Sequence, residues 1–580
     1  MPEPRFPAMA LALVAAMVAS GAPAFAARGT IDAEAAMRAY LQGRLALSTD
    51  DYGAASRWFD EALKGGDDDD AALRQSFDAA MLSGDLKTAV RLARRINSEP
   101  AAGTDDPDSP DDADNPNRGD SILALVKAAD AASRRDWRGY DAATTDFSAR
   151  NVRGVTEQVL GLSMEAWGKA ARGDIDAALA IADPAQSRGI LASYLREQRA
   201  NILAMAGRWG EAADLYADLT AGEGANVARL RLAAAASQLL ADPAAIEARE
   251  KAFLLVGGGP ANDPLLQEAR VRLLTDPRLD GRKLAGPALV TSPQQGLGLL
   301  FVRFAADLAR TGSTGPAINF GRLATLVDPS LADGWLMTSD ALARGEKYDA
   351  ALAALDHVPA STAWRQLTGL RRVQILAAAG RMDEARAILA RRAADADADA
   401  GDWERLADLE RRTGRHTQAV AAYGKALALL ADDDGPLAAQ LHFLRGSVLE
   451  SSGDWADAEP ELRKAVELGS DNAVYLNYLG YSLLDRGGDL AEARDLVARA
   501  FELAPESGAI MDSMGWAEYR SGNSARAVQL LEQAQSAEPS DPTIADHLGD
   551  ALWSMGRRIE ARHAWTAAAA LDPEPPLAES

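Results

Sequence analysis

The sequence predicts an all-α protein in which pairs of antiparallel helices stack into a solenoid. The composition favours helices, because alanine and leucine dominate, only 6% of the residues are aromatic and strand-like runs are scarce. Near the C-terminus, glycine, alanine and proline also recur at a fixed interval of 34 residues. Gly515, Ala527, Ala534 and Pro539 are followed at that interval by Gly549, Ala561, Ala568 and Pro573. An offset shared by four positions indicates an internal repeat.

Each recurring residue type has a physical role where two helices cross closely. Glycine in the first helix, as at Gly480, Gly515 and Gly549, leaves room for the partner helix. Alanine does the same in the second helix, and proline ends that helix because it lacks a backbone donor and clashes with the preceding turn. The glycines between the helices are placed as C-caps: Gly487-Gly488, Gly522 and Gly556. A period of 34 residues with this pattern is typical of the tetratricopeptide repeat (TPR).

The N-terminal part of the chain combines an export signal with the first repeats. Residues 1–26 contain an apolar core followed by the A-x-A motif Ala24-Phe25-Ala26, so we expect a signal peptide that is cleaved after Ala26. This core is too short to span a bilayer. Residues 27–97 keep the register of 34 as TPR-like repeats. Residues 98–120 are acidic, rich in proline and without apolar periodicity, which predicts a disordered insertion.

The remaining segments are predicted from the same register. Residues 121–256 form further TPR-like helical repeats, and residues 257–298 form an irregular joint rich in glycine and proline, with a short helix around Leu265–Leu274. The C-terminal TPR array covers residues 299–573, and a tail follows at 574–580. Spaced alanine pairs indicate about ten or eleven repeats, arranged as two superhelical halves on either side of the joint.

Charge and composition exclude several classes of partner. The formal charge of −24 and the pI near 4.7 argue against nucleic acid, since binding phosphate requires a basic face. The chain has no cysteine, which excludes disulfides, thiolate metal sites and a lipid-modified cysteine. No segment after the signal is apolar and long enough to span a membrane, so we expect no integral membrane segment in the mature chain. The oligomeric state stays open.

No pattern of residues indicates catalysis. The chain lacks the nucleophile elbow, the zinc-protease helix motif, the P-loop and the dinucleotide-binding loop. The histidines are scattered over different repeats: His357, His416, His442, His547 and His563. We therefore predict no enzyme activity, no metal site and no cofactor.

The first helices of the last three repeats carry the candidate binding residues. In a TPR, the positions flanking the glycine of the first helix line the inner groove. Here they are Asn477, Tyr481, Asp512, Trp516, Tyr519, Arg520, Asp546, Asp550 and Trp553. Aromatic rings interleaved with carboxylates suit an extended peptide, whose amides or basic groups the carboxylates would hold. The alternative is that Trp516 and Trp553 only pack between neighbouring helices.

The C-terminal hundred residues contain three further motifs: L-G-Y at 479–481, D-S-M-G-W at 512–516 and D-H-L-G-D at 546–550. With these motifs, the segment from Tyr475 to Pro573 resembles the large exported TPR proteins of proteobacteria. That group includes the lipoprotein adaptor of the periplasmic carboxy-terminal processing protease. The resemblance implies a periplasmic adaptor that presents client proteins. The adaptor is tethered by a lipidated cysteine, which this chain lacks, so the resemblance does not imply membrane anchoring.

We therefore predict a non-catalytic, exported scaffold or adaptor that binds protein or peptide partners in its concave groove. Two alternatives stay open. One is a scaffold for envelope assembly or polysaccharide export, and the other is a cytosolic TPR scaffold if the signal is not cleaved.

Overall fold

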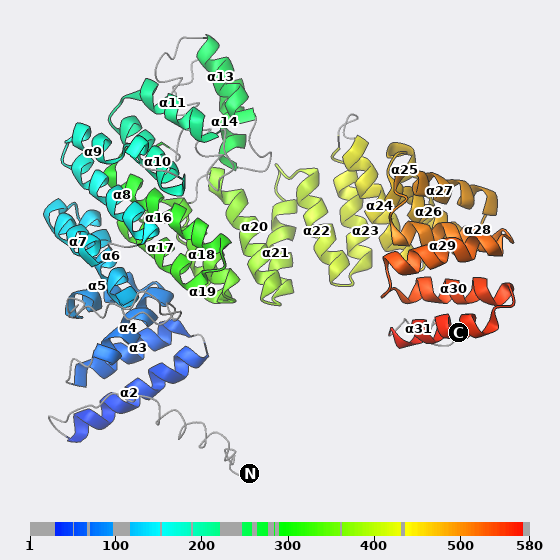
Figure 1. Cartoon of the computed structure of the whole chain (residues 1–580), viewed down its shortest axis with the longest axis horizontal. Helices are drawn as coiled ribbons and strands as arrows, with labels where there is room; N and C mark the ends of the chain where they lie inside the picture. Colours follow the sequence, from blue (N-terminus) through cyan, green and yellow to red (C-terminus); the bar gives the residue numbers. More distant parts are fainter. Residues whose placement is uncertain are drawn as a thin grey trace. The chain divides into compact units, whose positions relative to one another are not determined.

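A computed structural model of the chain describes residues 30–49, 51–65, 70–96, 117–150, 154–186, 189–220, 246–257, 264–276, 284, 289–359, 362–430 and 435–571. These residues form 28 α-helices and two short 3₁₀ helices and contain no strand, which confirms the all-α prediction (Figure 1). The predicted signal peptide, the tail at 574–580 and residues 98–116 of the predicted insertion lie outside the described residues.

Helices follow one another in pairs from the first described residue. The N-terminal helices are α2 (Thr30–Ser48), α3 (Tyr52–Ala62), α4 (Asp70–Ser83), α5 (Leu86–Arg95), α6 (Asn117–Ser133), α7 (Trp137–Arg150), α8 (Val155–Ala171), α9 (Ile175–Ile181), α10 (Gly189–Met205) and α11 (Trp209–Thr220). They continue with α13 (Ile246–Gly257), α14 (Pro264–Thr275), α16 (Pro293–Arg310), α17 (Thr314–Val327), α18 (Ala332–Arg344), α19 (Tyr348–Leu355) and α20 (Thr362–Ala378). The 3₁₀ helices are Leu63–Gly65 and Pro184–Gln186.

The C-terminal helices continue the same pairing. They are α21 (Met382–Ala393), α22 (Ala400–Arg412), α23 (His416–Leu427), α24 (Gly435–Ser451), α25 (Trp455–Leu468), α26 (Ala473–Asp485), α27 (Leu490–Leu503), α28 (Gly508–Arg520), α29 (Ser524–Ala537), α30 (Pro542–Ser554) and α31 (Arg558–Ala570).

The repeated glycines lie where two helices approach most closely, as the sequence predicts. A Cβ built on Gly515 of α28 would lie 2.7 Å from Leu531 of α29, and one on Gly480 of α26 would lie 2.7 Å from Val497 of α27. Neither contact is possible without a shift of the contacted side chain or of its helix. The turns also match, because Gly522 and Gly556 have φ values of 84° and 78°, the left-handed conformation of a helix C-cap.

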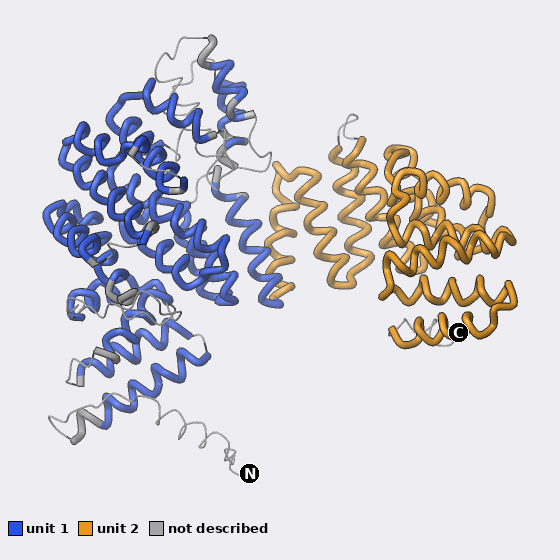
Figure 2. The backbone as a smooth tube through the Cα atoms, in the orientation of Figure 1, with its two compact units in different colours: residues 1–380 blue, residues 381–580 orange. Residues whose placement is uncertain are grey.

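The structure divides the chain into two compact units, residues 1–380 and residues 381–580 (Figure 2). The predicted joint at 257–298 lies within unit 1. Its short helix is present as α14, but the second array begins earlier than Leu299, because α16 starts at Pro293. Glycine and proline mark where helices are interrupted, but they carry no information about which surfaces those helices bury.

In unit 1, the helices after the joint pack back onto the N-terminal repeats. α16 contacts α8 and α10, while α17 contacts α4 and α6. One hydrophobic core accordingly extends from Leu63 to Leu331. α16 is suited to this position because most of its residues are apolar and buried, among them Leu300, Phe301 and Phe304.

Candidate functional site

The first helices of the last three repeats form one continuous face in unit 2. Each of α26, α28 and α30 packs on its own partner helix, and in addition α26 contacts α28 and α28 contacts α30. We call the surface made by the predicted binding residues of these three helices the α26–α28–α30 face. Local sequence fixes where the helices begin: Asn472, Ser507 and Asp541 accept hydrogen bonds from the first free backbone N–H groups of α26, α28 and α30.

Asp512 is engaged inside the protein rather than free for a ligand. It is only 5% exposed, and Nδ1 of His547 donates to its two carboxylate oxygens at 2.9 and 3.1 Å. The sequence predicted Asp512 as a partner-binding residue, whereas in the structure its carboxylate bridges α28 and α30. His547, which sequence reasoning set aside among scattered histidines, lies at the centre of the candidate site.

One signal in the sequence could have identified His547. His547 follows Asp512 by 35 residues, which is one more than the repeat period of 34. It therefore lies one position after the equivalent of Asp512 in the next repeat and faces the preceding first helix, α28. Burial lowers the pKa of His547, but the Asp512 carboxylate and the nearby Asp546 and Asp550 charges outweigh it, so the net pKa is raised.

Trp516 is partly buried and lies in a stack of rings. Its indole is parallel to the imidazole of His547, with centroids 4.1 Å apart and an interplanar angle of 14°, and it also stacks on Tyr519 at 5.0 Å. Tyr481 from α26 approaches the same imidazole, at 6.1 Å. Two predicted aromatic residues from successive repeats, Tyr481 of α26 and Trp516 of α28, are thus brought together at His547.

Asp546 and Asp550 are one helical turn apart on α30 and partly exposed. Among the described residues neither carboxylate forms an ion pair with a lysine or arginine. Burial and the neighbouring Asp550 carboxylate raise the pKa of Asp546, although His547 opposes the shift. Burial also raises the pKa of Asp550, again against the effect of His547. Like charges at this spacing repel each other, so the two carboxylates form a negative site that only the neighbouring His547 opposes by its charge, with no lysine or arginine paired to it among the described residues.

The other predicted residues have mixed roles. Arg520 donates from Nη1 to the Leu484 carbonyl at 2.9 Å, which ties α28 to the C-terminal end of α26. Asn477 is partly buried, and within the described part of the chain its Oδ1 has no donor. Trp553 is 42% exposed and lies at the end of the face, 5.5 Å from Trp565 and 5.2 Å from the Arg558 guanidinium. Trp553 is therefore not sealed between helices.

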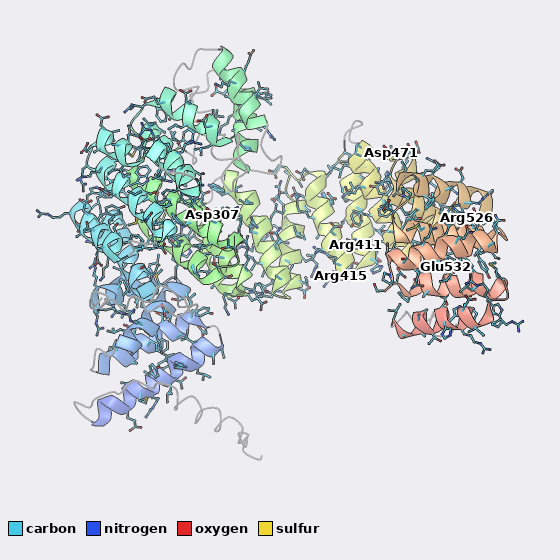
Figure 3. All side chains as sticks on the ribbon, viewed as in Figure 1. Asp307, Arg411, Arg415, Asp471, Arg526 and Glu532 are labelled. Atoms are coloured by element: carbon cyan, nitrogen blue, oxygen red, sulfur yellow. The ribbon has the colours of Figure 1, made fainter. Side chains whose placement is uncertain are left out.

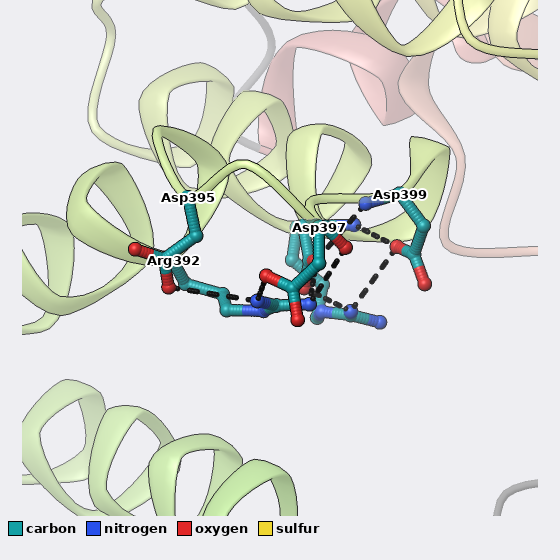
Figure 4. A network of polar contacts seen from close by, with 6 residues as sticks. Arg392, Asp395, Asp397 and Asp399 are labelled. Carbon is teal, nitrogen blue, oxygen red and sulfur yellow. Dashed lines mark hydrogen bonds and ion pairs between the residues drawn. The ribbon is translucent and has the colours of Figure 1, made fainter.

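A second polar network in unit 2 is structural. From the last turn of α21, Arg392 donates to Asp397 at 2.6 Å (Figure 4). It also pairs with the buried Asp402 of α22 at 3.0 Å. Arg405 pairs with the other oxygen of Asp402 at 2.7 Å, and Asp399 caps α22. These contacts compensate the Asp402 carboxylate from both sides, so they leave no free charge for a ligand.

The corresponding face of unit 1 is already covered by the chain itself. Gln294 of α16 donates to the Ala132 carbonyl at 3.3 Å, and Arg303 pairs with the buried Glu197 of α10. The hydroxyl of Tyr194 donates to Asp307 on α16, which is labelled in Figure 3. Arg322 of α17 reaches the C-terminal end of α4, where it donates to the Leu82 carbonyl at 3.3 Å.

Two negative findings concern the described residues only. No helix there has both the length and the apolarity to cross a bilayer. In the same residues, no group of three or more His, Asp or Glu side chains is arranged to hold a metal ion.

Comparison with solved structures finds proteins of low similarity to this chain. MamA is 22% identical over 30% of this chain and 91% of its own, with a TM-score of 0.26. YrrB, described as a TPR protein with an unusual peptide-binding site, is 21% identical over 33% of this chain and 95% of its own, with a TM-score of 0.27. The APC/C hetero-tetramer Cut9-Hcn1 is 13% identical over 99% of this chain and 98% of its own, with a TM-score of 0.33. All three scores are below 0.5, so they carry no functional argument.

The family comparison is more specific. Curated protein sequences give no significant match. Two family models described as tetratricopeptide repeat match residues 399–471, 448–508 and 479–542. The matched segments include α26 and α28 and reach the first residue of α30. Residues 399–542, all of which lie in unit 2, therefore match the tetratricopeptide repeat.

Proposed function

We propose that this protein is an exported, non-catalytic scaffold that binds a peptide segment carrying a basic side chain on the α26–α28–α30 face. The observation that carries the proposal is the pair of partly exposed carboxylates, Asp546 and Asp550, which form no ion pair with a lysine or arginine among the described residues. TPR arrays use surfaces of this kind to hold extended segments of other proteins.

The electrostatics of the face favour a cationic ligand group. The carboxylates of Asp485, Asp512, Asp541 and Asp546 all raise the pKa of Tyr481 further, after burial, so the field around these helices is negative. The one basic residue among the predicted positions, Arg520, is tied to the Leu484 carbonyl. A lysine or arginine side chain placed near Asp546 and Asp550 would relieve their mutual repulsion.

The same reasoning favours unit 2 over unit 1 as the binding array. In unit 1, α16 and α17 lie against the first helices α4, α6, α8 and α10. The buried apolar residues of α16 belong to the core of that unit, so a ligand could replace this helix only by unfolding it.

Export and the adaptor role are the finer parts of the proposal. The apolar core and the Ala24-Phe25-Ala26 motif support secretion. The resemblance of the C-terminal motifs supports a role as a periplasmic adaptor for a processing protease. Fusing residues 1–40 to a reporter that is active only outside the cytoplasm tests export, and a silent reporter would leave a cytosolic scaffold instead.

Binding is tested by fluorescence anisotropy with the mature chain and short labelled peptides that are identical except for Lys, Glu or Ala at one position. We expect the Lys peptide to bind most tightly and its affinity to fall as salt is added. The double change Asp546→Asn and Asp550→Asn should weaken its binding by about tenfold, or ~1.4 kcal/mol. Glu532→Gln, on the exposed surface of the second helix α29 (Figure 3), is the matched control. Equal affinity for the Lys and Glu peptides would refute the proposal.

A further inference from the structure

The last two repeats are joined by a buried pair of ionisable residues. His547 of α30 is 6% exposed and Asp512 of α28 is 5% exposed. The imidazole Nδ1 lies 2.9 and 3.1 Å from the two oxygens of the carboxylate. Within the described residues no lysine or arginine pairs with Asp512, so the charge that compensates this carboxylate is that of a protonated His547.

One face of the His547 imidazole also packs against an aromatic ring. Trp516 lies parallel to it at 4.1 Å, the arrangement in which an aromatic ring stabilises a cation. The ring of Tyr481 on α26 lies 6.1 Å from the imidazole of His547. Asp512 on one edge and Trp516 on one face therefore both favour the charged form of His547.

We propose that the His547–Asp512 pair is a protonation-dependent latch that holds α30 against α28 and thereby sets the affinity of the α26–α28–α30 face. The link to affinity rests on the function proposed above, whereas the latch itself does not. Since Asp546 and Asp550 flank His547 on the same helix, any opening of α30 displaces the two carboxylates that bind the basic group.

The charge, rather than the hydrogen bond, makes the pair sensitive to pH. A neutral imidazole can still donate from Nδ1, but Asp512 is then a buried anion without a compensating charge, which is costly. The ionisable groups that face His547 are Asp512 of α28, Asp546 and Asp550 of α30, and Tyr481 of α26. Among the described residues, no hydrogen bond or ion pair joins His547 to a side chain of α29 or α31.

The sign of the effect follows from the raised pKa of His547. A group whose pKa is higher in the closed state stabilises that state fully below its ordinary value of about 6.5. This stabilisation is lost as the pH rises through the raised pKa. The latch is therefore closed in acid and released toward alkaline pH.

Hydrogen exchange of the ligand-free mature chain measures the latch directly. After correction for intrinsic exchange, the opening constant of α30 should rise by up to about tenfold for each pH unit above about 6.5, until the raised pKa is passed. His547→Gln keeps a donor toward Asp512 but does not titrate, so its α30 should open more at low pH and show no such dependence. His563→Gln, on the exposed surface of α31, is the matched control and should behave as the wild type.

An unchanged pH dependence in His547→Gln, or none in the wild type, would overturn the latch. A second measurement covers the case in which the variant fails to fold. An NMR titration of the wild-type imidazoles should contain one signal with a midpoint above the ordinary value, and its absence would also overturn the proposal. Binding of the Lys peptide at low and high pH then tests the coupling: equal affinity refutes it. Absence of binding at every pH refutes the proposed function. The latch is then still tested by hydrogen exchange, which does not depend on the peptide.

Discussion

Gly296→Ala tests whether α16 fills the inner face of the N-terminal repeats. A Cβ at this position would lie 2.1 Å from the ring of Trp167 on α8. That ring is fully buried, and its Nε1 is held by Gln198 at 2.9 Å, so it has no free space to move into. Accommodating the methyl group requires α16 to move away from α8. Overpacking of this kind costs about 1–3 kcal/mol.

A second glycine provides the control that isolates this steric cost. Gly369 lies inside α20 of the same unit, and among the described residues a Cβ there would meet no atom within 4 Å. Replacing a helical glycine by alanine stabilises a helix by about 1 kcal/mol. The gain in helix propensity applies to both substitutions, so the difference between the variants measures the clash alone.

Hydrogen exchange of peptides from α8 and α16 is the appropriate assay, because a chain with two units is not expected to unfold in a single step. We expect faster exchange in α8 and α16 for Gly296→Ala, and unchanged or slower exchange in α20 for Gly369→Ala. If Gly296→Ala protects these helices as well as Gly369→Ala protects α20, then α16 does not pack on Trp167 in solution and the filled inner face is wrong.

Two further predictions follow from the same packing. Arg303→Met removes the cation that pairs with the buried Glu197, so it should destabilise unit 1 by about 3–5 kcal/mol. Arg310→Met breaks an exposed pair with Asp307 and should cost less than about 1 kcal/mol. Equal thermal shifts for the two variants would contradict this reasoning. A fragment of residues 381–580 should be helical by circular dichroism and monodisperse by gel filtration, because its hydrophobic clusters lie within it. A fragment of residues 299–580 should aggregate, because it exposes Leu300, Phe301 and Phe304, which are buried in the whole chain. The opposite result would place the boundary between the units at the joint.

Much of the C-terminal array could be predicted from the sequence because the information is local and periodic. The interval of 34 residues places Gly480, Gly515 and Gly549 at equivalent crossings, and the structure confirms the close contacts at Gly480 and Gly515. The helical spacing also identifies which side chains share the α26–α28–α30 face. These inferences need only the helical period and the steric demands of two crossing helices.

The partner that each of these side chains contacts could not be predicted in the same way. Asp512 and Asp546 occupy equivalent places in successive repeats, yet Asp512 is bonded to His547 and Asp546 has no basic partner among the described residues. The difference depends on the residue that the next repeat presents to each carboxylate. Packing between repeats decides which residue that is, and this residue can differ from repeat to repeat without changing the period.

By itself, the sequence determined an all-α array of paired helices, with tetratricopeptide repeats at 399–542 and an aromatic and acidic face near the C-terminus, because repeat period, small residues and turn glycines act over short distances. The tertiary structure alone decided that the units divide near Gly380 and that α16 and α17 cover the N-terminal repeats. Those contacts join residues more than a hundred positions apart, such as Gln294 with Ala132 and Tyr194 with Asp307. No local pattern encodes them, since an apolar helix face specifies that it will be buried and not which surface will bury it.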